Sequence, residues 1–541
     1  MSAGASGVPR ASGGALRGLA DPWFLGVLAL VLAATELPYV AAERAVGAGA
    51  MFAGHFAYDG DIHMILSFVR QAREGAWLFE NRFTPEPHEP ALFNLAWLLF
   101  GRLAALLDLG PNAALRVARV LGAVVLCGAF WTVAGAMLRT HAWRRVAFAA
   151  FATGGGFGWA FVLANAAAAR LADGGAALPV LAADLRGGFH PFWQILNSGH
   201  LSLAHGLLLA TVGVLAAAVR DRSRGKLAAA TVGGVLVGLV RPVDLRVFLA
   251  VAASTATVVT VRDRRRGRPV PWRLWWPAAA ALLPLAQHAV LFGTHPVFRW
   301  WRLQNTVVPP GPAELVAAVG LAGVIALVAL VTTAVRLPED DARVPLWSYV
   351  AVACAAPLAY PLVSFAGQIL DPLAGAALLG AVAWLEGRTR GAWSRAGTAA
   401  AVGLLVLNAA SSAWLVRDAL DPGKLRARTI EADDAEVLGW HGAHAPTDAV
   451  VLTPPRLRAR VAGRTHCREY CGYHFATVDF ATKAAFVRAT YAAAADGTPV
   501  LEAVRSEGVE LVVLPAAAPG APSAPVVFEN AAWRVIDLRD R

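Results

Sequence analysis

The densest group of ionisable side chains that can do chemistry lies between residues 58 and 90. Asp59 and Asp61 flank a glycine there. A second polar group follows about one helix later and consists of Glu86, His88 and Glu89. Apolar runs long enough to cross a bilayer flank the block, so its charges are costly without water, partners or a ligand. We interpret the block as a functional site; a solvated loop with a polar face is the alternative.

Paired carboxylates at a membrane surface suit two kinds of chemistry. One carboxylate can act as a general base that takes a proton from an attacking hydroxyl. Two carboxylates with a histidine nearby can hold a divalent cation, such as Mg²⁺ or Mn²⁺, which neutralises a phosphate leaving group. His200, at the head of a later apolar run, can join them, although a structural hydrogen bond is the alternative role for such a histidine. The predicted metal ligands are Asp61, His88 and His200.

A further polar loop, residues 294–312, supplies cationic and aromatic side chains. Arg299 and Arg302 can each fork onto phosphate oxygens. The neighbouring tryptophans fit either a sugar face or the aromatic belt at the membrane surface. The other candidate substrate-binding residues of this loop are Gln304 and Asn305. Together, the three loops can receive a lipid phosphate from the side and a polar acceptor from outside.

The chain that positions these residues is strongly apolar. Of its 541 residues, 57% are hydrophobic and 16% are charged, whereas a soluble protein carries about 25% charged residues. Apolar runs near the ~20 residues needed to cross a bilayer recur until about residue 415. The sequence therefore predicts an α-helical polytopic membrane protein in contact with the lipid bilayer. The net charge of +11 does not indicate nucleic-acid binding, because the basic residues form short clusters between spans.

The apolar runs also predict the organisation of the chain. Residues 1–20 are rich in Gly, Ala and Ser and are expected to form a disordered cytosolic tail. Residues 21–417 are expected to form the membrane domain, with an acidic first outer loop at 43–90. About twelve runs can be counted, but that even number conflicts with the basic cluster at 139–145, which belongs in the cytosol. We therefore predict 11 or 13 crossings, with one early segment miscounted and the last domain outside.

The first outer loop contains an amphipathic pattern. Apolar residues recur at helical spacing at Ile62, Ile65, Leu66 and Val69. Residues 62–74 are therefore expected to form a helix on the membrane surface, with Arg70 and Arg73 toward water or head groups. Asp61 precedes this helix, where aspartate makes a good N-cap. Capping is thus the alternative to a catalytic role for Asp61.

Charged residues return in the last part of the chain, residues 418–541. Strand-like runs occur at 449–453 and 511–514, and helical patterns lie near 482–494 and 500–506. This order predicts a small α/β domain of ordinary size.

Two cysteines of this domain, Cys467 and Cys471, are close in sequence. If the domain is extracytoplasmic, they can pair. The neighbouring His466 and His474 make a zinc site the alternative, although the spacing matches no common zinc motif.

Several strings of this chain resemble a group of bacterial polytopic membrane proteins assigned to the GT-C superfamily of membrane glycosyltransferases. The strings are DIHMILSFVRQAREGAWL from Asp61, FTPEPHEPALFNLAWLLFGRLA from Phe83, GGFGW from Gly155, NSGHLSLAHGLLLA from Asn197, LQNTVVPPGPAELVAAVG from Leu303 and GRTHCREYCGYHFATVDFATKAAFVRATY from Gly463. The superfamily is similar to this chain in its many spans, its acidic first outer loop and its C-terminal extracytoplasmic domain.

The resemblance implies inverting transfer of a hexosyl or pentosyl group from a polyprenyl-phosphate donor, in the bacterial cell membrane. Asp61 takes the position of the acidic loop residue, and Asp59 is a second acidic candidate. The other polar motif positions fall on Glu86, His88 and His200. One departure is that the group often has an arginine pair where this chain reads PLVSFAGQILDP. Gln368 is a poor substitute for that phosphate contact.

The leading hypothesis is therefore a membrane glycosyltransferase that uses a lipid-linked sugar donor and an extracytoplasmic acceptor (a lipid, glycan or protein). A transporter or flippase of lipid-linked saccharides is the first rival, but the spans carry few acidic residues of the kind that ion-coupled carriers need. A non-catalytic membrane scaffold is the second rival, and it leaves the acidic loop unexplained. Fold-level analogy alone does not decide among them.

Overall fold

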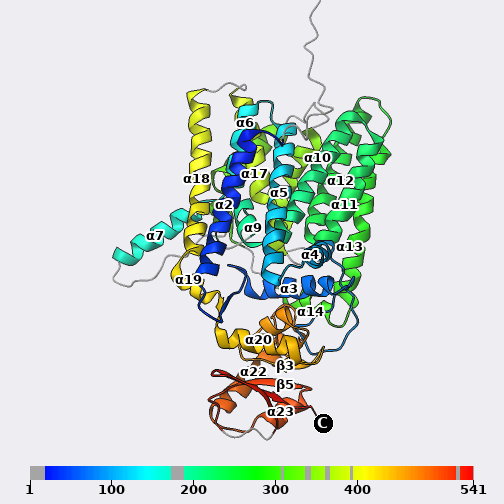
Figure 1. Cartoon of the computed structure of the whole chain (residues 1–541). Helices are drawn as coiled ribbons and strands as arrows, with labels where there is room; N and C mark the ends of the chain where they lie inside the picture. The colour runs from blue at the N-terminus through cyan, green and yellow to red at the C-terminus, as the bar shows by residue number, and fades with distance from the viewer. Residues whose placement is uncertain are drawn as a thin grey trace, which may run out of the picture.

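A computed structural model shows a bundle of helices with a smaller mixed unit at one end (Figure 1). It describes residues 19–171, 185, 188–305, 310–334, 343–359, 366–389, 394–519 and 524–539. All but the last two residues of the expected disordered tail, 1–20, lie outside these ranges. Residues 429–539 contain the larger sheet and are called the C-terminal unit below.

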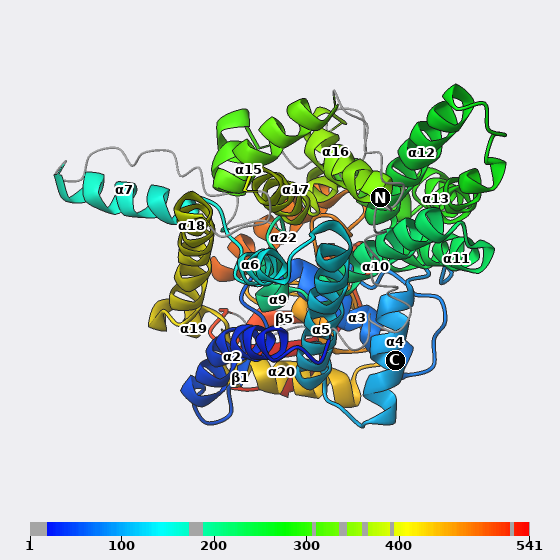
Figure 2. The same cartoon turned by 90° about the horizontal axis from the view of Figure 1, so that it is seen from above.

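Eight helices in the described ranges are long and apolar enough to cross a membrane. They are α2 (Pro22–Ala45), α5 (Pro111–Met137), α10 (Gly199–Asp221), α12 (Pro242–Arg265), α13 (Trp276–Thr294) with the preceding turn η1 (Trp272–Trp275), α15 (Pro312–Ala334), α17 (Leu373–Arg388) with the preceding turn η4 (Ala366–Leu370), and α18 (Arg395–Ala419). Two shorter helices, α11 (Arg224–Val240) and α16 (Val344–Ala359), pack among them (Figure 2). The predicted polytopic helical fold is confirmed.

One of the apolar runs counted as spans, residues 91–107, is too short to be one. Its residues form α4 (Leu95–Leu106), which has 12 residues and is therefore only ~18 Å long, against a hydrocarbon core of ~30 Å. The side chain of Asn94 caps the start of α4, and the left-handed Asp108 follows its end. Without this span, the basic residues 139–145 come after two long helices, α2 and α5, so a cytosolic tail no longer conflicts with a cytosolic position for this cluster. The total of 11 or 13 crossings stays a prediction.

Two short helices replace the single span that the apolar run at about 146–167 predicts. α6 (His141–Ala152) ends before a glycine-rich segment, and α7 (Gly158–Leu171) then leaves the bundle, as both views show (Figures 1 and 2). A Cβ at Gly156 would lie 2.0 Å from the carbonyl oxygen of Ala318, so α15 packs directly on this turn. α9 (Pro191–Asn197) is buried near α6 and leads into α10.

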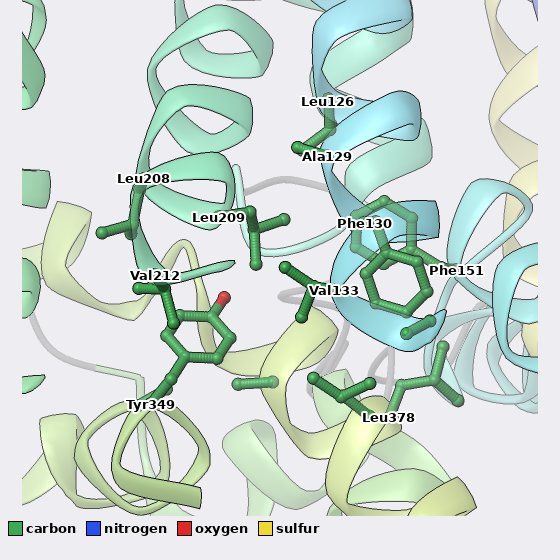
Figure 3. Packing of buried hydrophobic residues seen from close by; sticks show 14 of the residues in the cluster. Leu126, Ala129, Phe130, Val133, Phe151, Leu208, Leu209, Val212, Tyr349 and Leu378 are labelled. Atoms are coloured by element: carbon green, nitrogen blue, oxygen red, sulfur yellow. The ribbon is translucent and has the colours of Figure 1, made fainter. Parts of the chain in front are cut away.

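The core of the bundle lies where α5 packs against α10. Large apolar side chains of both helices interlock there with residues of α6, α16 and α17 (Figure 3). The two backbones approach closely at glycines, the usual device for packing helices in a membrane. A Cβ at Gly122 would lie 2.4 Å from the carbonyl oxygen of Gly199, and one at Gly206 would lie 2.7 Å from the backbone nitrogen of Leu126.

The C-terminal unit is built on a five-stranded sheet with the order β4-β3-β5-β7-β6. Its strands are β3 (Val450–Leu452), β4 (Arg468–Glu469), β5 (Leu511–Pro515), β6 (Val526–Glu529) and β7 (Trp533–Asp537). β3 is parallel to β4 and β5, and β7 is antiparallel to β5 and β6. Its helices are α20 (Ala432–His444), α21 (Arg460–Arg464), α22 (Phe480–Ala495) and α23 (Leu501–Ser506). Both predicted strands and both predicted helices are confirmed.

The unit is joined to the bundle in three ways. The short helix α19 (Pro422–Ala427) follows α18. A two-stranded sheet pairs β1 (Met51–Phe52) of the first outer loop with β2 (Thr429–Ile430). The helices α3 (Asp59–Arg73) and α14 (Phe298–Gln304) lie at the same end of the bundle, facing the unit (Figure 1).

The close approach of α5 and α10 gives a stability prediction. We expect Gly206→Ala to lower the thermal unfolding midpoint of the detergent-purified protein, because the added methyl meets backbone that cannot move aside; such overpacking costs about 1–3 kcal/mol. Gly403→Ala in α18 is the matched control, since an added methyl there would meet no neighbouring atom within 4 Å. Equal midpoints for the two variants would contradict the packing argument.

A buried acid in the C-terminal unit gives a pH prediction. Glu469 accepts a hydrogen bond from the Thr453 hydroxyl, and burial raises its pKa to about 8 from an ordinary 4.5. Because the unfolded chain loses this proton first, stability should fall as pH rises from about 4.5 to about 8. Glu469→Gln should flatten that fall in the thermal midpoint, whereas Glu502→Gln, at an exposed position, should not. Parallel curves for wild type and Glu469→Gln would show that Glu469 does not titrate in this range.

Candidate functional site

Helix α3 holds the acidic pair and lies between the helical bundle and the C-terminal unit (Figure 1). Every residue from Ile62 to Val69 is buried, including His63 and Ser67. The predicted helix is confirmed, but Arg70, which was expected to face water or head groups, bonds to His466 of the C-terminal unit at 3.0 Å, whereas Arg73 is exposed as expected. The position of α3 on the membrane surface stays a prediction. A Cβ at Gly463 of α21 would come within 2.8 Å of the His63 Cβ, so this contact has no spare room.

Asp61 is in the first turn of α3 but does not cap it. The helix begins at Asp59, so its N-cap residue is Tyr58 rather than Asp61. Instead, the Asp61 carboxylate accepts the hydroxyl hydrogen of Tyr473 at 2.6 Å. Burial raises the pKa of Asp61, and the Tyr473 hydrogen bond acts in the opposite direction. The capping interpretation is thus wrong, and the carboxylate points toward the C-terminal unit.

Asp59 lies between two histidines. His55 Nε2 is 3.0 Å from its carboxylate, and His63 Nδ1 is 3.7 Å from it. Burial raises the pKa of Asp59, but the two imidazoles outweigh that effect and lower it. In the described part of the chain, His55, Asp59 and His63 are the one group of three such residues whose ligand atoms all lie within 4.8 Å of one another. Two histidines and one aspartate are a typical set of ligands for a metal ion.

Two observations test whether a metal fits these three residues. Both ring nitrogens of the buried His55 lack a well-aligned hydrogen bond, so its lone pair can serve a metal. His63 Nδ1 lies 2.8 Å from the Asp59 carbonyl oxygen and must therefore donate to it. Its lone pair is then on Nε2, which receives the Arg464 Nε–H at 3.4 Å. His55 and Asp59 fit a metal as they stand, whereas His63 can bind one only after Arg464 moves.

The predicted metal trio of Asp61, His88 and His200 is not assembled. Both nitrogens of His88 are already used: Nε2 accepts the Asn81 N–H at 3.0 Å, and Nδ1 donates to the Glu86 carbonyl at 2.8 Å. These bonds shape the loop and leave no lone pair for a metal.

Glu86 and Glu89, the neighbours of His88 in sequence, do not join it in a common site. The Glu86 carboxylate receives the Lys483 ammonium and the Thr84 hydroxyl. Glu89 is exposed. The expected grouping of these three residues around Asp61 is therefore replaced by a contact of the loop with α22.

His200 lies on the bundle side of α3. Its Nδ1 is 3.0 Å from the Ser198 hydroxyl, and it lines a small cavity of about 20 Å³ with Ile62, Ile65 and Arg119. This volume suits about one water molecule. His200 thus approaches α3 from the bundle, while Tyr473 approaches it from the C-terminal unit.

A buried charged group joins three helices of the bundle. The Arg241 guanidinium, just before α12, donates to Asp244 at 2.9 Å and to Asp371 at 2.5 Å. Gln368 lies 3.5 Å from the same guanidinium. Arg241 therefore supplies a guanidinium next to Gln368, in the segment that lacks the expected arginine pair; residues 361–365 of that segment lie outside the described ranges. With two carboxylates around one guanidinium, the group carries a net charge of −1 when ionised, so it does not attract a phosphate.

Helix α14 carries the predicted cationic residues. Arg299 and Arg302 are both exposed. Gln304 has a different role, since its amide donates to the Thr477 carbonyl at 2.7 Å and accepts the Phe480 N–H at 3.0 Å. Asn305 is the C-cap residue of α14. Gln304 therefore binds the C-terminal unit, and the arginines remain accessible to a ligand.

The two cysteines of the C-terminal unit are free, so the disulfide that their closeness in sequence allows is not formed. They pack in different hydrophobic clusters: Cys467 contacts the group around Val451 and Leu511, and Cys471 contacts the group around Val450 and Val512. Burial raises the pKa of each thiol to about 11. Neither cysteine belongs to a metal-ligand group in the described residues.

Sequence reasoning missed His55 and Tyr473. The spacing of His55, Asp59 and His63, four residues each, was a usable signal for the first. Tyr473 lies 412 positions from Asp61, and no local pattern connects them.

No family model matches the chain, and no curated protein matches it. Solved structures do. The Archaeoglobus fulgidus oligosaccharyltransferase with a tethered acceptor peptide is similar over 92% of this chain and 70% of that chain, with a TM-score of 0.51 and 10% identity. AglB from the same organism, in complex with an inhibitory peptide and a dolichol-phosphate, gives the same coverage and TM-score at 11% identity.

The mycobacterial arabinofuranosyltransferase AftD is similar over 97% of this chain but only 42% of that chain, with a TM-score of 0.50 and 16% identity. AglB and AftD are polytopic membrane glycosyltransferases of the GT-C fold. This chain therefore has the GT-C fold. At such low identity the likeness concerns the fold alone.

Proposed function

We propose that this protein is a glycosyltransferase that moves a sugar from a polyprenyl-phosphate donor to an extracytoplasmic acceptor. One observation carries the proposal: a GT-C fold places the carboxylate of Asp61 at the junction of bundle and C-terminal unit, where its one hydrogen bond from the described residues leaves the second oxygen available. A solved neighbour of the same fold is in complex with dolichol-phosphate, a lipid of the proposed donor class.

In this proposal Asp61 is the general base. It takes the proton of the acceptor nucleophile as the acceptor forms its bond to the anomeric carbon and the bond from that carbon to the phosphate oxygen breaks. Attack from the face opposite the phosphate inverts the anomeric centre. Burial makes the carboxylate more basic, which favours proton uptake. Arg299 and Arg302 hold the departing phosphate. Both side chains are exposed, and one guanidinium can donate two hydrogen bonds to two phosphate oxygens.

The proposed orientation places the C-terminal unit outside the cytosol. The strongly basic stretch 262–268 forms the last turn of α12 and the residues that follow it, at the end of the bundle away from that unit (Figure 1). Positive charge favours the cytosolic side of a membrane. We therefore propose a bacterial cell membrane location, with Asp61 on the outer side.

A divalent cation at His55 and Asp59 is part of the proposal. Two imidazoles and one carboxylate favour Mn²⁺ over Mg²⁺, since Mg²⁺ prefers oxygen ligands. Bound at Asp59, in the same first turn of α3 as Asp61, the cation would supply positive charge for the transferred phosphate. To bind the cation, His55 would offer a ring-nitrogen lone pair, and Arg464 would have to move away from His63 Nε2.

One observation favours the transporter alternative. The Arg241, Asp244 and Asp371 group is buried among membrane helices, where ion-coupled carriers keep charged residues. A flippase would keep moving lipid-linked saccharide when Asp61 is neutralised. Assays of both lipid movement and sugar transfer on one variant therefore separate the two functions.

The decisive variant is Asp61→Asn. In membranes supplied with a labelled polyprenyl-phosphate sugar, we expect it to lower the transfer rate by roughly 10²- to 10⁴-fold, the usual contribution of a general base. Asp108→Asn is the control, because that carboxylate also contacts α3, through Arg73, but is exposed. Unchanged transfer by Asp61→Asn would refute its role as the base.

The metal assignment has its own prediction. Treatment with a chelator should lower transfer, and Mn²⁺ should restore it at lower concentration than Mg²⁺. His55→Ala should raise the Mn²⁺ concentration for half-maximal recovery at least about tenfold, as expected for a lost ligand. The control His444→Ala removes an exposed imidazole that only bonds its own helix. Full activity in the presence of the chelator would contradict the metal assignment, and His55 and His63 would then serve only as ion-pair partners of Asp59.

A further inference from the structure

Tyr473 brings a hydroxyl group from the C-terminal unit to the carboxylate of Asp61. The phenol donates to Asp61 Oδ1 at 2.6 Å. The Tyr473 side chain is 8% exposed, and its ring lies on Gly60, where a Cβ would come within 2.2 Å of a ring carbon. The contact is therefore tightly packed as well as hydrogen-bonded, and it needs a glycine between the two aspartates.

The backbone that carries Tyr473 is held from two loops of the membrane domain. The Tyr473 N–H donates to the Thr477 hydroxyl at 3.2 Å, and that hydroxyl donates to the Phe83 carbonyl at 2.6 Å. Gln304 of α14 donates to the Thr477 carbonyl at 2.7 Å. Asn81 donates to the Ala476 carbonyl at 2.6 Å. The phenol is thus presented from a segment with fixed position rather than from a free loop.

A carboxylate that takes a proton must be held in one orientation toward the nucleophile. The described residues supply a hydrogen bond to Oδ1 of Asp61 and none to Oδ2. Rotation of the carboxylate would break the bond to Tyr473, so the bond keeps Oδ2 available in a defined direction.

We infer that Tyr473 is a positioning residue for Asp61, and that docking of the C-terminal unit is thereby a condition of transfer. The inference rests on the proposed function, in which Asp61 is the base. Tyr473 acts through Asp61 and needs no contact with the sugar or its phosphate. Its loss should therefore lower kcat and leave the KM for the donor lipid nearly unchanged.

The first test is Tyr473→Phe, which removes the hydroxyl and keeps the ring. We expect kcat to fall about tenfold or more, with the donor KM within about threefold of wild type. Tyr470→Phe is the control from the same segment, because its hydroxyl donates at 2.5 Å to Glu507, away from α3. Gly60→Ala is a second variant that keeps the hydroxyl but displaces the ring, and it should reproduce the loss of kcat. If Tyr473→Phe does not fold, the kcat of Gly60→Ala alone tests whether the Tyr473 hydroxyl positions Asp61.

The second test combines Tyr473→Phe with Asp61→Glu, which keeps a displaced carboxylate. If Tyr473 acts through Asp61, the double variant loses less than the product of the two single losses. Losses that multiply fully would show a merely structural role and overturn the inference. Normal kcat in both Tyr473→Phe and Gly60→Ala, with transfer abolished in Asp61→Asn, would also overturn it while leaving the proposed function intact. Normal transfer by Asp61→Asn would overturn the proposed function itself.

Discussion

The contact between the C-terminal unit and α3 is the interaction on which the rest of the structure depends. α3 carries apolar side chains together with buried polar ones, His63, Ser67 and Gln71. Such a helix suits neither lipid, which leaves its polar groups without partners, nor water, which exposes its apolar residues. The bundle covers one side and α21 covers another, so α3 is stable only when both are in place.

Three of the charges near α3 are tolerated for the same reason, because each of these three has a partner across this contact. Asp61 bonds to Tyr473, Glu86 bonds to Lys483, and Arg464 donates to the Ala53 carbonyl at 2.7 Å. A buried ionised group without such a partner costs several kcal/mol. The first outer loop and the C-terminal unit thus satisfy one another's polar groups, and the site is made by both rather than by either alone.

The sequence predicted what depends on local pattern. Apolar runs identified the membrane helices, and the runs of β-branched residues at β3 and β5 identified the sheet. The prediction of a functional site at Asp59–Asp61 also came from the cost of these charges beside a membrane, and it stays a prediction. Composition could not separate α4 from a span, because its length is set by a cap at Asn94 and a turn at Asp108. Nor could composition show that both ring nitrogens of His88 bond to its own loop, or that Tyr473 donates a hydrogen bond to Asp61, since these contacts are set by the tertiary fold.

The backbone of residues 81–84 bonds directly to the segment 469–478: the Glu469 N–H donates to the Arg82 carbonyl at 2.9 Å, and the Gly472 N–H to the Phe83 carbonyl at 3.3 Å. Nearly the whole membrane domain is synthesised between these two stretches. The first outer loop must therefore wait, with its polar groups unmatched, until the last quarter of the chain has been made and has folded. Closing so long a loop is slow. During synthesis, α3 is thus a late element of the protein although it stands near the beginning of its sequence.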